Sequence, residues 1–470
     1  MDLLIKNGTL VTESQILRAD IGVEAGIVTQ LGSNIRSSGS NIIDASGKLV
    51  LPGGIDAHTH FEMPFMGTYT ADDFESGTIA AACGGITTVI DFAVQEKRDT
   101  LLGTLEKWRR KADPKVCVDY ALHMIIRDLN ETTFGEIEQL VNRGIPSFKL
   151  FMTYRKEELL LDDGSILRVM QEVAKHRGLV GLHCENNDLV EYFTGGLLKE
   201  GRRQTKYHSE ARPAIVEGEA VRRAIALAEV TGTSIYVVHT SSRLGREAIR
   251  DARHRGMPVF GETCPHYLMF TDEVYSRPDG MKFVMSPPIK KDIDRVALWE
   301  GLAKGDIKTV GSDHACFTSE QRLMGGDDIT KMPNGVAGTE VIIPILFSEG
   351  VRNGIISLNT LVQVTSYNPA RLFGLWPQKG TIAVGCDADL VVFDPDMNVQ
   401  LTHSNLHSRI DYSIYENYTC HGYPVITISR GAIIQEHGRF NAQRGRGRFV
   451  ERRISPENRL DQVRFGSGVV

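Results

Sequence analysis

Six side chains that suit metal chemistry stand at or near the ends of short apolar runs in this 470-residue chain. Imidazole and carboxylate are natural ligands of zinc-like ions. Two histidines of "DAHTHF" are two positions apart, so both point the same way along a strand. A lone strand-end histidine is more often a hydrogen-bonded structural residue, but the set together predicts a metal centre. Its members are His58, His60, Lys149 of "SFKLFMTY", His183 of "GLVGLHCE", His239 of "SIYVVHTS" and Asp313 of "KTVGSDHA".

Lys149 is the least expected member of this set, because an ammonium without a partner is costly to bury in a strand. One interpretation is a side chain that extends its charged tip into solvent. The other is a lysine whose pKa is lowered by burial and by nearby positive charge, so that it reacts as a free amine. We favour the second, because four histidines are expected beside it. His123, His266 and His314 fit the set less well, and we expect them to be structural.

The candidate residues lie on strand-like runs that alternate with amphipathic helical patterns, such as 218–232 and 243–256. Eight βα units predict an α/β fold with a (β/α)8 TIM-like barrel, whose reactive groups gather at the carboxyl ends of the strands. A doubly wound open sheet is the alternative, but no glycine-rich phosphate-binding fingerprint follows the first run. The eight expected strands are 53–61, 87–94, 119–126, 147–154, 178–185, 234–241, 258–266 and 308–315.

The two ends of the chain have a different texture, with short β runs separated by Asn-Gly, Ala-Gly and Ser-Gly turns. We predict one small β-sandwich domain built from residues 1–52 and 375–440, and a catalytic barrel over 53–374. Residues 441–470 form a C-terminal arm with seven arginines. We expect the arm, from about Arg444, to lie on a neighbouring subunit or to be disordered. RNA binding through its RGRGR run is less favoured on an acidic chain.

Composition indicates a soluble globular protein, with 41% hydrophobic and 24% charged residues. The net charge of −6 gives no general attraction to nucleic acid or to anionic membranes. We see no secretory signal pattern and no apolar run of 18 residues. Seven scattered cysteines without CxxC spacing predict buried, reduced thiols and a cytoplasmic location, with a catalytic cysteine as the weaker alternative.

The segments "DAHTHFEMPF", "FKLFMTY", "LHCEN", "VVHTSS" and "GSDHA", in this order, resemble those of the cyclic amidohydrolases. The similarity is greatest to the dihydropyrimidinase/D-hydantoinase group and extends over nearly the whole chain. It implies metal-dependent hydrolytic ring opening of cyclic amides to N-carbamoyl amino acids. Dihydropyrimidines such as dihydrouracil and 5-substituted hydantoins are the implied substrates. The resemblance also implies a homotetramer.

The same resemblance implies two divalent metal ions. Zinc is expected, and manganese or cobalt accept the same ligands. A metal-bridging hydroxide would attack the ring carbonyl, with Asp313 as general base. Tyr154, at the end of its run, would donate its hydroxyl to the developing oxyanion. The implied ligands are His58, His60 and Asp313 for the first ion, His183 and His239 for the second, and Lys149, as N6-carboxylysine, between the two.

Substrate recognition is implied at two further positions, Ser286 of "MSPP" and Asn334 of "MPNG", where the family holds the ring amide largely through main-chain atoms. An apolar gate for the exocyclic substituent is expected, although ordinary loop packing is equally compatible. Dihydroorotases typically carry an arginine where this chain has Glu62, so an anionic substrate is disfavoured. The expected gate residues are Met63, Phe65, Phe151 and Leu159.

Two rival functions follow from the same motifs. Allantoinase, or another cyclic imide hydrolase, is the rival within the class, but its substrate carries a polar ureido group and the expected pocket is apolar. A non-catalytic dihydropyrimidinase-related scaffold protein is the rival from another class, and the complete ligand set argues against it. The sequence leaves the physiological substrate and the enantiomer preference open.

Overall fold

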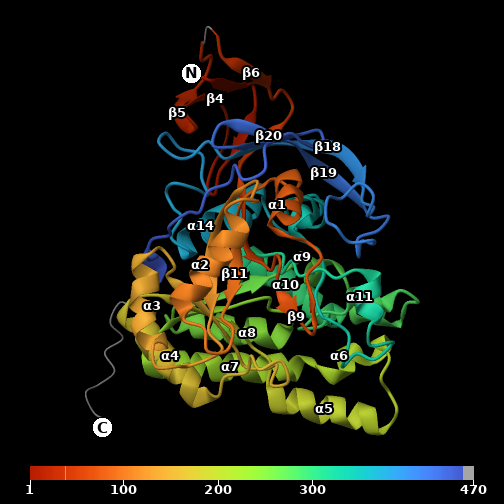
Figure 1. Ribbon diagram of the computed structural model, residues 1–470. Helices are drawn as coiled ribbons and strands as arrows, with labels where there is room; N and C mark the ends of the chain where they lie inside the picture. Colours follow the sequence, from red (N-terminus) through yellow and green to blue (C-terminus); the bar gives the residue numbers. More distant parts are fainter. Residues whose placement is uncertain (37–38, 459–470) are drawn as a thin grey trace.

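The computed structural model describes residues 1–36 and 39–458. Its centre is an eight-stranded parallel sheet wrapped by helices, and β-layers from both ends of the chain stand at one end of the molecule (Figure 1). The predicted α/β barrel with an added β domain is therefore confirmed. The barrel strands are β8 (Gly54–Thr59), β11 (Ile86–Val94), β12 (Asp119–Ile125), β13 (Ser147–Phe151), β14 (Leu179–His183), β15 (Ser234–Val237), β16 (Val259–Thr263) and β17 (Thr309–Val310).

The barrel strands pair in chain order from β8 and β11 through to β17. The segment after β17 then returns to β8 and nearly closes the barrel. Ser312 donates its backbone N–H to Asp56 at 3.0 Å, and His60 donates its N–H to the carbonyl of His314 at 2.9 Å. Because this closure joins the first and last strands, it brings the HxH motif beside Asp313.

Seven of the eight barrel strands end earlier than the sequence predicts. After three of them comes a candidate site residue with positive φ. β13, β15 and β17 have five, four and two residues, where eight were expected in each run. Tyr154, His239 and Asp313 follow them with φ of 68°, 37° and 48°. The left-handed region is uncommon for residues other than glycine and cannot continue a strand. Such backbone is often held in place at functional sites.

Helices cover the outside of the barrel, and polar caps mark where several of them begin. Asp162 and Ser242 accept backbone N–H groups at the starts of α4 and α8, as N-cap residues do. Gly232 ends α7 in the left-handed conformation at φ 68°. The helices are α1 (Phe74–Cys83), α2 (Leu101–Ala112), α3 (Thr133–Asn142), α4 (Asp163–Lys175), α5 (Asn187–Lys199), α6 (His208–Ala211), α7 (Ala214–Thr231), α8 (Arg243–His254), α9 (Pro265–Met269), α10 (Asp292–Lys304), α11 (Ser319–Leu323), α12 (Ile342–Ile345), α13 (Leu358–Val362) and α14 (Asn368–Leu372).

The β domain combines strands from both ends of the chain, as the turn-rich texture predicts. A four-stranded sheet has the order β5-β4-β1-β6, and a seven-stranded sheet has the order β21-β20-β19-β18-β7-β2-β3. Their facing apolar residues form a core of their own. The strands are β1 (Leu3–Lys6), β2 (Thr9–Val11), β3 (Ile16–Arg18), β4 (Asp20–Glu24), β5 (Ile27–Gly32), β6 (Asn41–Asp44), β7 (Leu49–Pro52), β18 (Leu390–Gln400), β19 (Thr419–Ser429), β20 (Ala432–Glu436) and β21 (Arg439–Phe440).

The C-terminal arm lies on its own barrel up to residue 458. Tyr120, on β12, donates its N–H to the carbonyl of Arg448 at 2.9 Å and accepts from the N–H of Val450 at 2.8 Å. Arg446 donates to two backbone carbonyls, and Arg452 is buried and donates to Leu122 and Ser147. This position differs from the expected one on a neighbouring subunit, because these arginines satisfy carbonyl groups of the same chain. Residues 459–470 lie outside the described residues.

No helix within residues 1–36 and 39–458 is long and apolar enough to cross a membrane. All seven cysteines are buried and free, and burial raises the pKa of thiols such as Cys184 and Cys264. The prediction that the cysteines are buried is therefore confirmed, and none of the seven is in a disulfide. A reactive thiolate needs a lowered pKa, which argues against a catalytic cysteine.

Candidate metal centre and substrate cavity

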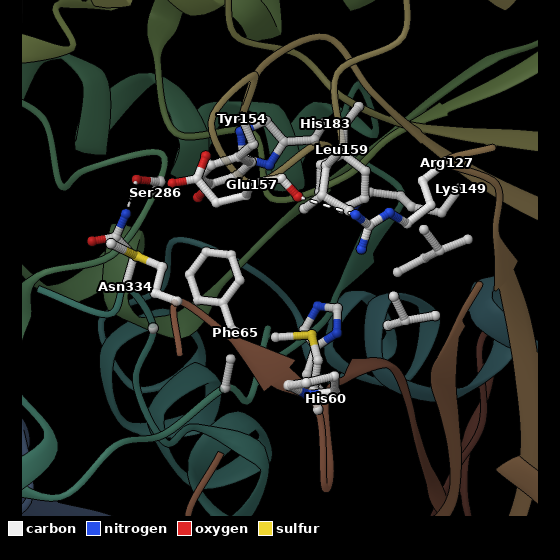
Figure 2. A pocket seen from close by; sticks show the side chains of 18 of the residues that line it. His60, Phe65, Arg127, Lys149, Tyr154, Glu157, Leu159, His183, Ser286 and Asn334 are labelled. Atoms are coloured by element: carbon white, nitrogen blue, oxygen red, sulfur yellow. Dashed lines mark hydrogen bonds between the residues drawn. The ribbon is translucent and has the colours of Figure 1, made fainter. Parts of the chain in front are cut away.

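A cavity of about 870 Å³ opens at the carboxyl ends of the barrel strands, and all thirteen predicted site residues line it (Figure 2). They come from strands and loops spread over most of the chain. The sequence therefore identified a set that the fold brings together. The lining residues from this set are His58, His60, Met63, Phe65, Lys149, Phe151, Tyr154, Leu159, His183, His239, Ser286, Asp313 and Asn334.

Asp313 lies between the two histidines of the HxH motif. Its Oδ1 is 3.1 Å from Nε2 of His58 and 3.3 Å from Nε2 of His60. On the other side of its ring, His58 donates Nδ1–H to Glu262 at 2.6 Å. Gly311 permits this approach, because a Cβ there would lie 2.5 Å from Glu262 Oε2. Glu262 thus fixes the His58 ring with Nε2 directed at the candidate metal position, in the manner of a carboxylate behind a metal-binding histidine.

The second pair of histidines, His183 and His239, lies next to the first, with their ring centroids 4.5 Å apart. His183 donates Nε2–H to the buried carboxylate of Glu185 at 2.7 Å, which leaves Nδ1 to bind a metal. Arg212 pairs with the same carboxylate oxygen at 2.6 Å. Each half of the site therefore has one histidine oriented by a buried glutamate. Sequence reasoning missed both glutamates, since they are recognised only by their partners.

Lys149 lies inside the barrel, with 1% of its surface exposed. Among the described residues its ammonium makes neither a hydrogen bond nor an ion pair. Its neighbours are the rings of Phe92 and Phe151, 5.1 and 5.2 Å from Nζ. Burial lowers the pKa of Lys149 to about 8, against the opposing effect of Asp313 and Glu262. The side chain is therefore not extended into solvent.

The donor set was tested against the requirements of a divalent ion. Burial lowers the pKa of His60 to about 4 and that of His239 well below its usual value, so both rings are neutral, as ligands must be. His58 Nε2, His60 Nδ1 and His239 Nδ1 are buried and have no hydrogen-bond partner among the described residues. One ligand atom each from His58, His60 and Asp313 lies within 4.8 Å of the other two. This group fits a metal ion, because coordination would satisfy the orphaned His58 Nε2.

The pKa of His58 shifts in the opposite direction, because two carboxylates lie beside its ring. Burial alone would lower it, but the carboxylates of Glu262 and Asp313 raise it to about 9. The same proximity holds the pKa of Asp313 well below its usual range, although burial opposes this. This corner of the site thus has a local excess of negative charge, which a cation would neutralise.

Tyr154, Ser286 and Asn334 form one polar cluster next to His183, whose ring centroid is 5.2 Å from that of Tyr154 (Figure 2). Asn334 donates to Ser286 Oγ at 2.9 Å. Burial raises the pKa of Tyr154 to about 12, while Arg212 and contacts with Ser286 and Asn334 act in the other direction. The phenol is therefore a neutral donor at ordinary pH. The guanidinium of Arg212 lies 5.5 Å from the centre of the Tyr154 ring, so the arginine supports this side chain as well as Glu185.

The expected gate residues are partly aromatic and pack against the site. Phe65 lies edge-on to Tyr154 at 5.6 Å, and Phe151 stacks on His183 at the same centroid distance. Met63 and Leu159 line the cavity beside them. The sequence had suggested an apolar cavity, but the observed cavity is only partly apolar. Five charged residues that were not predicted also line it, namely Glu96, Arg127, Lys156, Glu157 and Lys331.

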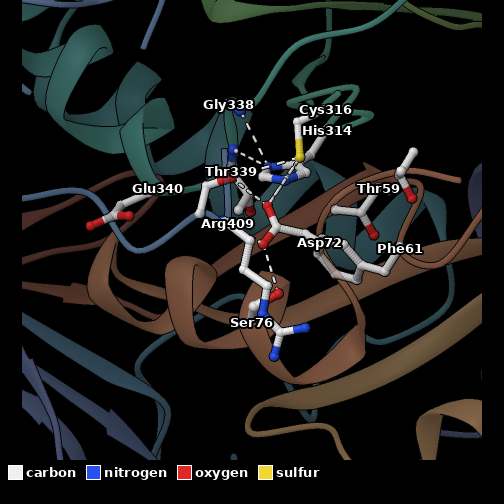
Figure 3. Close-up of polar contacts among 12 residues, drawn as sticks. Thr59, Phe61, Asp72, Ser76, His314, Cys316, Gly338, Thr339, Glu340 and Arg409 are labelled. Atoms are coloured by element: carbon white, nitrogen blue, oxygen red, sulfur yellow. Dashed lines mark hydrogen bonds and ion pairs between the residues drawn. The ribbon is translucent and has the colours of Figure 1, made fainter. Parts of the chain in front are cut away.

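His314 has a different environment from its neighbour Asp313 (Figure 3). Its Nε2 donates to Asp72 at 2.9 Å, and its Nδ1 accepts from the N–H groups of Gly338 and Thr339 at 3.3 and 3.4 Å. Asp72 also accepts from Cys316 and other neighbours. Because these groups satisfy one another, the cluster suits a structural clamp on the Asp313 turn better than a second metal site.

The model of the amidohydrolase family matches residues 49–434. A D-hydantoinase from Geobacillus stearothermophilus is 42% identical over 456 residues, which are 96% of this chain and 97% of that protein. The chain belongs to the dihydropyrimidinase/D-hydantoinase family of amidohydrolases. A D-phenylhydantoinase from Escherichia coli is 41% identical over 457 residues, with 96% of this chain and 98% of the relative covered. The predicted family membership and enzyme class are thus confirmed.

Solved structures of this hydrolase family have the same fold. The crystal structure of a dihydropyrimidinase from Brevibacillus agri superposes with a TM-score of 0.95 at 42% identity, covering 97% of this chain and 99% of that one. An L-hydantoinase from Arthrobacter aurescens gives a TM-score of 0.90 at 32% identity, covering 96% and 100%. Solved structures named D-hydantoinase and L-hydantoinase thus share this architecture.

Proposed function

We propose that this protein opens the rings of dihydropyrimidines and 5-substituted hydantoins by hydrolysis, giving N-carbamoyl amino acids. The proposal depends on one observation, namely that candidate metal ligands and polar groups suited to holding a ring lie in one cavity. Six candidate metal ligands and the polar cluster of Tyr154, Ser286 and Asn334 line the same cavity. A flat cyclic imide needs both, since one amide bond must be cleaved while the rest of the ring is held.

The proposed ligands are those named from the sequence, with Lys149 as N6-carboxylysine between two divalent ions, Zn²⁺ in the first instance. The burial, lowered pKa and missing partner of Lys149 support this role. A carbamate would replace an unpaired cation by an anion with two oxygens. When bound, the ions supply Lewis-acid polarisation of the scissile carbonyl and lower the pKa of water. Mn²⁺ and Co²⁺ accept the same ligands.

Asp313 is the proposed general base. Its lowered pKa keeps it ionised, and in this role it would accept the proton of the attacking water and deliver it to the leaving ring nitrogen. Tyr154 donates its hydroxyl to the oxygen on which charge develops. Ser286 and Asn334 orient the ring, and their mutual hydrogen bond fixes the geometry of that wall.

Tyr154→Phe tests the oxyanion role. The variant should lose on the order of 10²–10³ in kcat while keeping its metal, because the hydroxyl acts mainly in the transition state. Metal content by atomic emission is the matched control. A loss below tenfold, or a loss of metal, would assign Tyr154 to packing.

A substrate panel tests the function as a whole. We expect the metal-loaded protein to hydrolyse dihydrouracil, dihydrothymine, hydantoin and 5-phenylhydantoin with higher kcat/KM than allantoin or dihydroorotate. Using D- and L-5-phenylhydantoin separately measures the enantiomer preference. Preferred turnover of allantoin would replace the proposal by allantoinase activity. No turnover of any cyclic amide by metal-loaded protein would overturn it.

We also propose a homotetramer in the cytoplasm, and the free, buried cysteines support the reducing location. Because residues 441–458 lie on their own barrel, subunit contacts should survive removal of residues 459–470. Light scattering of full-length protein and of that truncation measures this directly. A monomeric full-length protein would refute the assembly.

A further inference from the structure

The charge that faces a substrate in this cavity differs from what the motif beside the HxH pair suggests. Glu62 is not among the residues that line the cavity. It contacts Lys115 and lies 3.5 Å from the N–H of Phe74, outside the site. Another positive group lines the cavity, namely Arg127, two residues beyond the end of β12. Glu62 therefore gives no reason to exclude anionic substrates, because it lies outside the cavity and Arg127 lines it.

Arg127 is held rigidly at the end of its strand. Gln95 accepts the backbone N–H groups of Arg127 and Asp128 with its side-chain oxygen, both at 3.1 Å. The side chain is 17% exposed. Figure 2 shows its guanidinium projecting into the space that Phe65 and Leu159 also face. The cation thus lies in the part of the cavity assigned to the exocyclic substituent.

Most N–H donors of the Arg127 guanidinium have no acceptor among the described residues. A guanidinium has five N–H donors, and Arg127 makes two long contacts through Nη2, at 3.4 Å to the carbonyl of Glu157 and 3.3 Å to Oε2 of Glu158. Nε is buried without a partner, and Nη1 has none among the described residues. Donors left over on a charged group beside a substrate cavity call for an acceptor from the ligand.

The positive charge is also incompletely neutralised. Glu158 is 54% exposed and contacts Lys97 at 2.5 Å, more closely than it contacts Arg127. Glu96, on the cavity wall, is paired with Lys107 at 2.6 Å. The carboxylate of Glu157 helps to raise the pKa of Arg212, which lies at the Tyr154 side of the cavity.

Two further cations, Lys156 and Lys331, line the cavity without an ion pair among the described residues. The region that Phe65 and Leu159 face is therefore apolar, with the guanidinium of Arg127 beside it.

We infer that Arg127 is a specificity-determining residue that binds a carboxylate at the end of the exocyclic substituent, so that hydantoins with short carboxyalkyl side groups are preferred substrates. The inference rests on the proposed function and narrows its substrate class. In the reaction, water adds across one ring amide, the C–N bond breaks, and the nitrogen receives the proton. The side-chain carboxylate is unchanged and only binds. The product is an N-carbamoyl derivative of an acidic amino acid.

The experiment compares 5-(2-carboxyethyl)hydantoin with its neutral isostere 5-(2-carbamoylethyl)hydantoin. Wild type should favour the carboxylate in kcat/KM. Arg127→Gln should reduce this preference by about 10- to 100-fold, mainly through KM, as expected for a lost hydrogen-bonded charge. Arg127→Lys should keep part of it. Arg250→Gln is the control, because this arginine pairs with Asp251 outside the cavity, and the variant should leave the ratio unchanged.

The outcomes separate the possible failures. Equal loss for both substrates in Arg127→Gln would make Arg127 a tether of the 157–158 loop and overturn the inference. So would wild-type turnover of the neutral isostere, hydantoin and dihydrouracil with no preference for the carboxylate, and the proposed function would then stand. Absence of turnover for all of these substrates would remove the proposed function itself.

Discussion

Two lysines are buried in this molecule to the same degree, with 1% and 2% of their surfaces exposed, and they have opposite surroundings. Lys379 contacts three carboxylates where the barrel meets the β domain, at 2.8 Å to Asp119, 2.9 Å to Asp387 and 2.6 Å to Asp389. Burial disfavours its charge, but these partners raise its pKa above the usual value. Lys379 is therefore a permanent cation that joins the two parts of the fold.

Lys149 has no such partners, and burial lowers its pKa. The fold supplies aromatic rings and neutral imidazoles around it, where a structural lysine would have carboxylates. The contrast shows that burial alone does not assign a role to a lysine. The partners decide whether the buried amine is kept charged for stability or is left free to react.

The largest effect is expected at Lys149. Lys149→Ala should lose most bound metal and about 10⁴-fold in activity, because several kcal/mol of transition-state stabilisation depend on the ions. Acetate or propionate should restore part of both by entering the vacated space. Lys149→Arg cannot form a stable carbamate and should stay inactive. Atomic emission and turnover measure these outcomes, and near-normal turnover in Lys149→Arg would end the carbamate proposal.

Lys379→Met should act on stability instead. Removing the cation leaves buried carboxylates uncompensated, so unfolding in urea should reveal a loss of about 3–5 kcal/mol. Folded Lys379→Met should retain its metal, and carboxylic acids should not affect it. If the variant does not fold, Lys379→Met combined with Asp389→Asn should recover part of the stability. Unchanged stability in Lys379→Met would show that the three carboxylates do not need the lysine.

A third variant acts between these two extremes. Glu262→Gln retains the shape behind His58 but removes the charge that orients its ring, and it should weaken metal binding about 10- to 100-fold. Competition with a chelator gives the affinity, and thermal unfolding of metal-free protein is the control for structure. If Glu262→Gln lowered the thermal stability of the metal-free protein and left the metal affinity unchanged, Glu262 would be a purely structural residue.

The smallest effect is a pH dependence. Because the folded pKa of Lys149 is lowered to about 8 from 10.5, the free amine forms in the folded protein as the pH rises through about 8. Between pH 7 and pH 9 the free-amine fraction should rise about tenfold. The rate at which metal-free protein regains activity with metal and bicarbonate, normalised to dissolved carbon dioxide, should follow it. A midpoint near 10.5 would show an unperturbed lysine.

The same pKa shift has a consequence for stability. Between about pH 8 and pH 10.5 the unfolded chain binds a proton at Lys149 that the folded protein does not, so the metal-free fold gains stability as the pH rises through this window. Lys149→Met should lack this gain. Urea unfolding at pH 8 and pH 10 measures the difference between the two proteins.

The sequence was sufficient for the barrel and for the residues at its mouth, because each candidate stands at or near the end of its own strand. Local pattern located His58, His183 and the others, and the parallel arrangement then brings them together. The strands themselves were predicted too long, since a left-handed residue such as Tyr154 has no clear local signal in a run of β-forming residues.

Residues that act through distant partners were not accessible to the same reasoning. Glu262 and His58 are 204 positions apart, and Glu185 is recognised only once Arg212 lies beside it. Arg127 was missed because the contacts of its guanidinium depend on the position of the 157–158 loop, which the sequence does not indicate. The arm was expected on a neighbouring subunit because its arginines looked like surface charge, whereas Arg446 and Arg452 donate to backbone carbonyls of their own chain.

The position of Arg452 bears on how the chain is made. Its guanidinium donates to the carbonyl of Leu122 and the hydroxyl of Ser147, at the amino-terminal side of the barrel. Those acceptors emerge from the ribosome more than 300 residues earlier than the arginine that satisfies them. Domains form progressively during synthesis. Until Arg452 has been synthesised, the nascent barrel therefore lacks the donor for these two acceptors. Interruption of translation in that interval would leave an incomplete enzyme for chaperones or proteases to recognise.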